Sequence, residues 1–72
     1  MKGLNKQMFK VFDGVRIAVD TYEKEGVPKG KVGAVLEVYN NGEAYEVEFS
    51  NPVTGETILL QAFPADELEL VE

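Results

Sequence analysis

The 72-residue chain contains no cysteine, no histidine and no tryptophan, and Ser50 is its only serine. Without cysteine there is neither a disulfide framework nor a thiolate zinc site, and nothing marks an oxidising compartment. The lack of histidine and the single serine exclude catalytic triads and histidine acid–base chemistry. Only carboxylate chemistry remains, so we expect a protein that is not an enzyme and has no catalytic residue, no metal site and no cofactor.

Long apolar runs are missing as well. The longest span a few residues, far short of the ~20 needed to cross a bilayer, and the N-terminus lacks the apolar stretch of a signal peptide. We therefore expect a soluble protein, with the cytoplasm as its default location.

Basic residues are absent from more than half of the chain. Residues 1–31 hold all seven basic residues against four acids, a balance of +3, whereas residues 32–72 hold nine acids and no base, a balance of −9. Such a block of negative charge repels a phosphate backbone and attracts a basic protein surface. The plainer explanation is that the acids keep a small domain soluble.

The strongest positive signal is a hairpin in residues 31–49, where Asn41-Gly42 separates two runs rich in β-branched and aromatic residues. A two-residue turn at this dipeptide predicts one wholly apolar face, whereas a three-residue turn would mix the faces and bury a charge. The predicted apolar face consists of Ala34, Leu36 and Val38 from the first strand and Tyr45, Val47 and Phe49 from the second.

The same register predicts an unusual opposite face. It sets Glu37 directly across from Glu46, an arrangement of like charges that costs stability, and it puts Val35 across from Glu48. The two opposed glutamates could act as a carboxylate dyad or hold a hard cation such as magnesium or calcium. They would lie on an open sheet face, however, so solvated side chains are the simpler interpretation.

The rest of the chain predicts a single all-β domain over residues 14–72, preceded by an N-terminal extension over residues 1–13. In the extension, Leu4, Met8 and Phe12 fall four apart, as on one face of a short helix. Strands are predicted at residues 15–19, 31–39, 43–49, 56–63 and 68–71, with a long polar loop at 20–30 and one helical turn at 64–67. Five short strands without a long helix indicate a small barrel or rolled sheet.

This order of strand, long loop, hairpin, strand, single turn and short strand resembles the SH3-like barrel. Residues 28–36, which include Lys-Gly-Lys-Val-Gly-Ala-Val, are similar to the glycine-containing element of KOW-type and nitrile hydratase β-subunit-like barrels. Residues 13–71 resemble a bacterial family of unknown function, numbered four-nine-two-six. Three stretches carry this resemblance: the one just quoted, Gly-Glu-Ala-Tyr-Glu-Val-Glu-Phe, and Pro-Ala-Asp-Glu-Leu. The resemblance implies a small five-stranded SH3-like barrel with one short helical turn before the last strand, and it implies no activity.

A protein-interaction module is the first functional hypothesis, because an apolar rim of Val35, Tyr39 and Leu59 would be flanked by acidic side chains. The predicted partner-binding residues are Val35, Glu37, Tyr39, Glu46 and Glu48. A partner with a basic surface would fit them, for example a nuclease masked by an acidic antitoxin or immunity protein. The domain itself would be a monomer or a homodimer.

RNA or ribonucleoprotein binding is the second hypothesis, because an aromatic side chain among lysines can stack on bases. The predicted RNA-binding residues are Tyr22, Lys24, Lys29 and Lys31. The sequence pI of about 4.5 argues against it. A third hypothesis is an accessory subunit related to nitrile hydratase β-like proteins.

Overall fold

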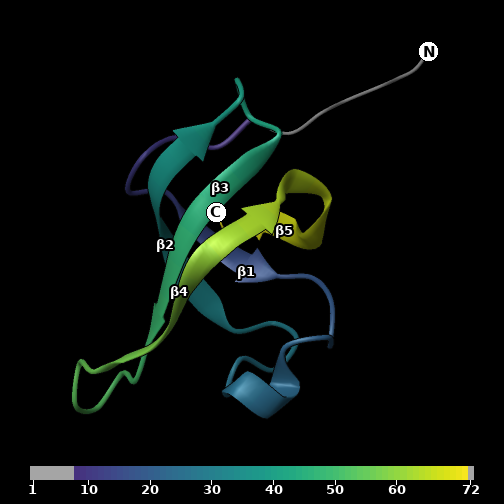
Figure 1. The fold of residues 1–72 in the computed structure, drawn as a ribbon. Helices are drawn as coiled ribbons and strands as arrows, with labels where there is room; N and C mark the ends of the chain where they lie inside the picture. The colour runs from purple at the N-terminus through teal and green to yellow at the C-terminus, as the bar shows by residue number, and fades with distance from the viewer. Residues whose placement is uncertain (1–7, 72) are drawn as a thin grey trace.

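Residues 8–71 are described by a computed structural model of the chain. Five antiparallel strands form one sheet in the order β4-β3-β2-β1-β5, and two single-turn 3-10 helices lie in the connections (Figure 1). The elements are β1 (Gly14–Ile17), η1 (Glu23–Glu25), β2 (Val32–Tyr39), β3 (Ala44–Ser50), β4 (Thr57–Pro64), η2 (Ala65–Glu67) and β5 (Leu68–Leu70). The predicted all-β class, the five strands and the single turn before the last strand are confirmed.

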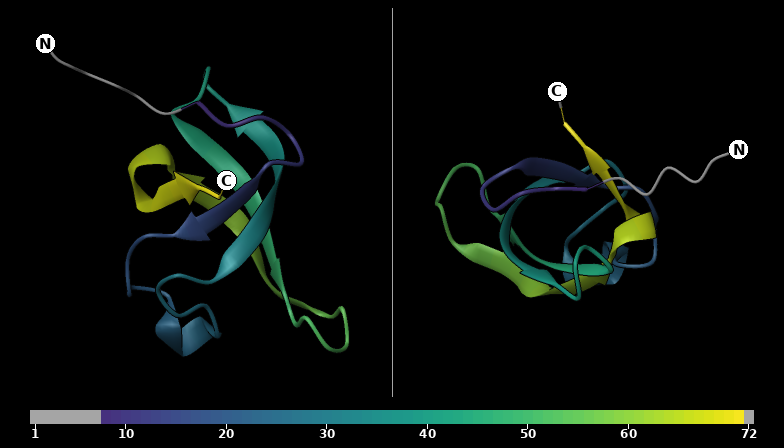
Figure 2. Two further views of the ribbon diagram at one scale, coloured as in Figure 1. Left: turned by 180° about the vertical axis from the view of Figure 1, so that it is seen from behind. Right: turned by 90° about the horizontal axis from the view of Figure 1, so that it is seen from above.

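The sheet curls strongly around a common core, as the view from above shows (Figure 2). The turn η2 carries the chain from edge strand β4 to edge strand β5, which pairs with β1. Alternate residues of β3 point inward because side chains of a strand alternate between its faces. The fully buried core side chains are Val15, Ile17, Val27, Val35, Tyr45, Val47, Phe49 and Phe63, with Phe9 and Leu68 almost as deep.

At the tip of the β2–β3 hairpin the predicted pairing is confirmed but the predicted turn is wrong. Tyr39 pairs with Ala44, as the two-residue turn required. The turn, however, is centred on Asn40-Asn41, both at positive φ (50° and 57°), and the N–H of Gly42 donates to the Tyr39 carbonyl. Positive φ at both central positions is what hairpin turns of this hand need, and asparagine tolerates it. The loop therefore spans four residues.

Lower in the hairpin, a β-bulge at Leu36 shifts the register. Glu37 pairs with Glu46 as predicted, but Val35 pairs with Val47 instead of Glu48. The prediction that Val35 lies on the outer face is therefore wrong, because Val35 is fully buried in the core. The predicted apolar face is wrong in the same stretch, since the extra residue moves Ala34 to a position opposite Glu48.

The connections also differ in detail from the predictions. The loop between β1 and β2 contains η1 and sends Val27 into the core. Residues 8–13 are not helical; Phe9, predicted to belong to the extension, is buried, and its N–H donates to the Tyr45 hydroxyl at 3.1 Å. Leu4, the first residue of the predicted helical face, lies outside the described residues.

None of the helices that the structure describes is long and apolar enough to cross a membrane.

Candidate functional site

The outward-facing side chains of β2, β3 and β4 form a three-strand surface, here called the outer face. The pairing of β3 with its two neighbours arranges these residues in rows. From the hairpin tip downward the rows are Tyr39, Ala44 and Pro64, then Glu37, Glu46 and Ala62, then Ala34, Glu48 and Leu60.

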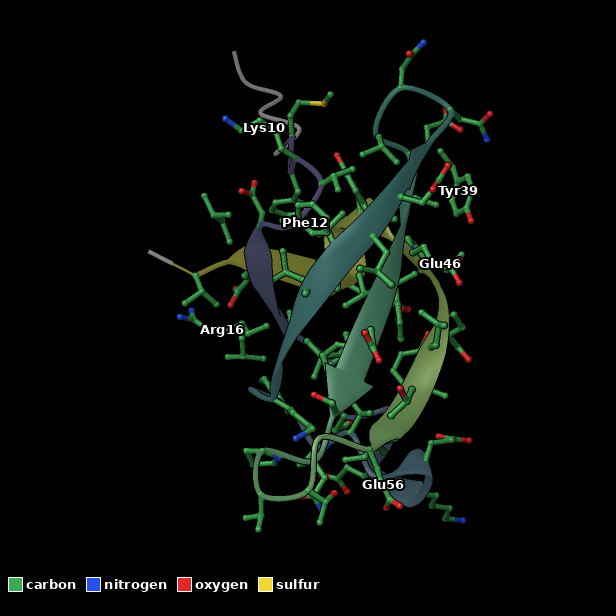
Figure 3. The ribbon with its side chains drawn as sticks, turned by 90° about the vertical axis from the view of Figure 1, so that its left-hand side faces the viewer. Lys10, Phe12, Arg16, Tyr39, Glu46 and Glu56 are labelled. Atoms are coloured by element: carbon green, nitrogen blue, oxygen red, sulfur yellow. The ribbon has the colours of Figure 1, made fainter. Side chains whose placement is uncertain are left out.

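Carboxylates lie in the middle of this surface. Glu37 and Glu46 are cross-strand neighbours, and Figure 3 shows Tyr39 and Glu46 close together beside β2 and β3. The Tyr39 hydroxyl donates to Oε1 of Glu46 at 3.0 Å, and this hydrogen bond is the main reason why the pKa of Tyr39 is raised above its usual range. Nearby Glu37 adds to the rise, because negative charge disfavours the phenolate.

No basic side chain within residues 8–71 forms an ion pair with these carboxylates. The one ion pair there joins Arg16 to Glu69 at 3.7 Å, and it lies on β1 and β5. Glu48 has a neutral partner instead, because the Thr57 hydroxyl donates to its Oε2 atom. The outer face therefore presents three carboxylates. Hydroxyl groups orient two of them, Glu46 and Glu48, and no basic side chain within residues 8–71 forms an ion pair with any of the three.

Apolar side chains from β4 border the carboxylates, and sequence reasoning missed them. Leu60, which is 47% exposed, pairs with Glu48, and Ala62 pairs with Glu46. The predicted rim residue was Leu59, but it pairs with the buried Phe49 and packs against the core. The sequence could not separate the two leucines because Ile58, Leu59 and Leu60 are apolar on both faces of the strand.

All five strands and the outer face lie within a segment that matches a known protein family. The match covers residues 11–70, which include all five strands. The chain belongs to the family described as Domain of unknown function (DUF4926). This confirms that part of the sequence resemblance, and the family description carries no activity. No curated protein and no solved structure gives a significant match to the chain.

The predicted RNA-binding residues of this DUF4926 domain lie in the loop between β1 and β2, whose η1 turn is at the end of the molecule away from the hairpin tip (Figure 1). Tyr22 is held there: its hydroxyl donates to Glu67 at 2.7 Å, and its ring packs edge-on against Phe63 with centroids 5.0 Å apart. The hydrogen bond, with burial, raises the pKa of Tyr22 to about 12. Lys24 and Lys29 are exposed. The Tyr22 ring is not free to stack on a base beside them, because it packs against Phe63.

Lys31 completes the predicted basic set and is half-buried at the end of this loop. The structure thus brings the three lysines to one loop of the DUF4926 domain, outside the rows of the acidic outer face.

A cation site on the outer face would need a further ligand besides Glu37 and Glu46. Within residues 8–71, no group of three or more acidic, histidine or cysteine side chains is placed to hold a metal ion.

Proposed function

We propose that this DUF4926 domain is a non-enzymatic protein-interaction module that docks its outer face on a basic protein surface. The observation that carries the proposal is the cross-strand pair of Glu37 and Glu46, with which no basic side chain in the described part of the chain forms an ion pair. Like charges directly opposite one another destabilise a sheet. A partner with lysine and arginine at this place would relieve that repulsion on binding.

The shape of the surface supports the same proposal. Tyr39, 37% exposed, and Leu60 lie on either side of the carboxylates and offer apolar contact area. Interfaces gain most of their affinity from a few such side chains, while the charges speed the encounter and select the partner. The nine acids and no bases of residues 32–72 extend the attraction beyond the face itself.

The partner class that fits best is a protein whose own surface binds phosphate, such as a nuclease. A row of carboxylates can replace the negative charge of a phosphate backbone, as expected of an acidic antitoxin or immunity protein. We also propose that the curled sheet is an SH3-like barrel, because the order of elements from β1 to β5 follows the order on which that resemblance rests.

Charge reversal on the outer face tests the proposal. The tagged full-length chain is used to isolate its partner, and the affinity for that purified partner is then measured by calorimetry. The double substitution Glu46→Lys with Glu48→Lys is expected to abolish binding while the far-UV circular dichroism stays unchanged. Glu23→Lys with Glu25→Lys makes the same change in charge on η1, at the end of the molecule opposite the hairpin tip, and should bind almost as the wild type does. Equal losses in both variants, or none in either, would refute docking through the outer face.

RNA binding has weaker support, because the Tyr22 ring is packed against Phe63 rather than presented to a base. Retention on immobilised RNA at low salt, lost on Lys29→Glu, would nevertheless establish it. An accessory-subunit role would show itself as a larger enzyme that co-purifies in constant stoichiometry.

A further inference from the structure

The short segment before β1 exposes an unusual amount of apolar surface. Met8 is 59% exposed, Val11 is 45% exposed and Phe12 is 80% exposed, whereas Phe9 between them is buried. Phe12 is labelled in Figure 3, beside β2. A phenylalanine this exposed adds little to the core.

The backbone at Phe12 has the geometry of a β-bulge that ordinarily contains glycine. Phe12 has a φ of 75°; its N–H donates to the Val35 carbonyl at 2.7 Å, while the Val35 N–H donates to the Asp13 carbonyl at 3.0 Å. Phe12 and Asp13 together thus face the single residue Val35. The Asp13 N–H also donates to the Lys10 carbonyl, which closes a turn with Phe12 at its third position. Positive φ at that place favours glycine on both counts.

A bulky side chain at this position opposes the stability of the fold. A residue with a Cβ atom strains the backbone in the left-handed region, and the exposed ring returns little burial energy. Glycine would fit the bulge, yet the chain carries an aromatic side chain there. Strained positions of this kind are often found at functional sites.

The bulge lies across β2 from the carboxylates of the outer face. Phe12 lies beside Val35 of β2, on the edge of β2 that faces β1. Glu46 of β3 lies beside Glu37, two residues further along β2 and on its opposite edge. With neighbouring strands ~4.8 Å apart and ~3.3 Å per residue along a strand, two strand spacings and an offset of two residues separate the two positions by roughly 12 Å. Figure 3 shows Phe12 on one side of β2 and Tyr39 with Glu46 on the other.

We propose that Phe12 is the aromatic anchor of the docking surface and inserts into an apolar pocket, edged by lysine or arginine, on a partner protein. This inference rests on the proposed function and adds to it the residue that gives apolar affinity. A basic partner is favoured over a second copy of this chain, because self-association would bring two unneutralised Glu37–Glu46 pairs toward each other.

Two synthetic peptides separate the anchor from the charges. Both carry lysines at their ends, and the centre is Leu-Ile in one and Ser-Ser in the other. By fluorescence anisotropy at low salt, the full-length chain is expected to bind the Leu-Ile peptide about tenfold more tightly than the Ser-Ser peptide. Phe12→Ala should abolish this difference and leave binding of the Ser-Ser peptide unchanged. Val53→Ala removes another exposed apolar side chain, in the distant β3–β4 turn, and should keep the difference.

Stability gives a second, independent readout. Phe12→Gly removes the ring and the backbone strain, so we expect its melting temperature to rise by about 4–8 °C, the shift of roughly 1 kcal/mol in a domain of this size. Phe12→Ala removes the ring but keeps the strain and should melt close to the wild type. Both variants should lose the preference for the Leu-Ile peptide.

The outcomes distinguish the two proposals. If neither peptide binds, the acidic docking surface itself is refuted and the anchor with it. If both peptides bind equally well to the wild type, the charges act but Phe12 is no anchor. A lower melting temperature for Phe12→Gly would mean that the ring supports the fold and would also overturn the inference. So would a wild-type dimer in sedimentation experiments that Phe12→Ala converts to a monomer.

Discussion

The substitution Glu37→Lys is expected to stabilise the domain, because it turns a repulsive cross-strand pair into an attractive one. Glu37 lies directly opposite Glu46 in the hairpin, and no base within residues 8–71 forms an ion pair with either. Cross-strand charge pairs contribute ~0.2–1 kcal/mol of either sign. Removing the repulsion and adding an attraction should therefore raise the free energy of unfolding by about 0.5–1.5 kcal/mol.

The free energy is measured by urea unfolding followed by far-UV circular dichroism, which suits a chain without tryptophan. Glu37→Gln is the matched control, since it removes the repulsion without adding a positive charge, and it should give about half of the gain. Both gains should shrink between 20 mM and 500 mM salt, because Glu37 is exposed and salt screens exposed charges.

A loss of stability in Glu37→Lys, or a gain that does not depend on salt, would show that the pair does not repel in the folded protein. The outer face would then hold no unfavourable charge pair for a partner to relieve.

Three further outcomes follow from the fold. Val35→Ala should cost about 2 kcal/mol because the side chain is fully buried, whereas Val53→Ala, at a position 90% exposed, should change the free energy of unfolding by less than ~0.5 kcal/mol in urea titrations. Gly33→Ala should cost roughly 1–3 kcal/mol in the same assay, because its Cβ atom would lie 2.6 Å from the Glu48 carbonyl oxygen. Gly14→Ala should cost little, because its Cβ atom would lie at an ordinary 3.8 Å from its nearest neighbour. Equal costs for the two substitutions would contradict the packing described. The pKa of Tyr22 is raised to about 12, against ~10 in an unfolded chain, so its contribution to stability is complete below about pH 10 and is lost between about pH 10 and 12. Across that window the free energy of unfolding should fall more steeply for the wild type than for Tyr22→Phe.

Much of the fold could be predicted from the sequence because its local signals agree. Alternation in residues 44–50 marks a strand with one buried face, and the asparagine-glycine tip ties it to its neighbour. The acidic pair Glu37–Glu46 followed from the same register and is where the sequence placed it. Pro64 ends β4 and η2 follows it, as expected from a residue that cannot donate to a ladder.

The parts that could not be predicted are those where the pattern is apolar on both faces. In β2 the run from Val32 to Leu36 offers no polar residue to fix the register, so the bulge at Leu36 and the burial of Val35 depend on contacts with β1 and β3. Phe12 could not be identified either, because nothing local marks a phenylalanine at positive φ. That conformation follows from pairing with a residue more than twenty positions away.

The loop between β1 and β2 has a practical consequence for proteases. Trypsin cleaves after lysine and arginine, and the last such residue, Lys31, ends this loop immediately before β2. Residues 32–72, which contain β2, β3, β4 and β5, therefore offer trypsin no cleavage site. A single nick at exposed Lys24 or Lys29 would cut the chain but leave β1 held between β2 and β5 by backbone hydrogen bonds. The entire acidic face lies on the fragment that follows the nick, so denaturing the nicked protein would separate this face from the basic first part of the sequence.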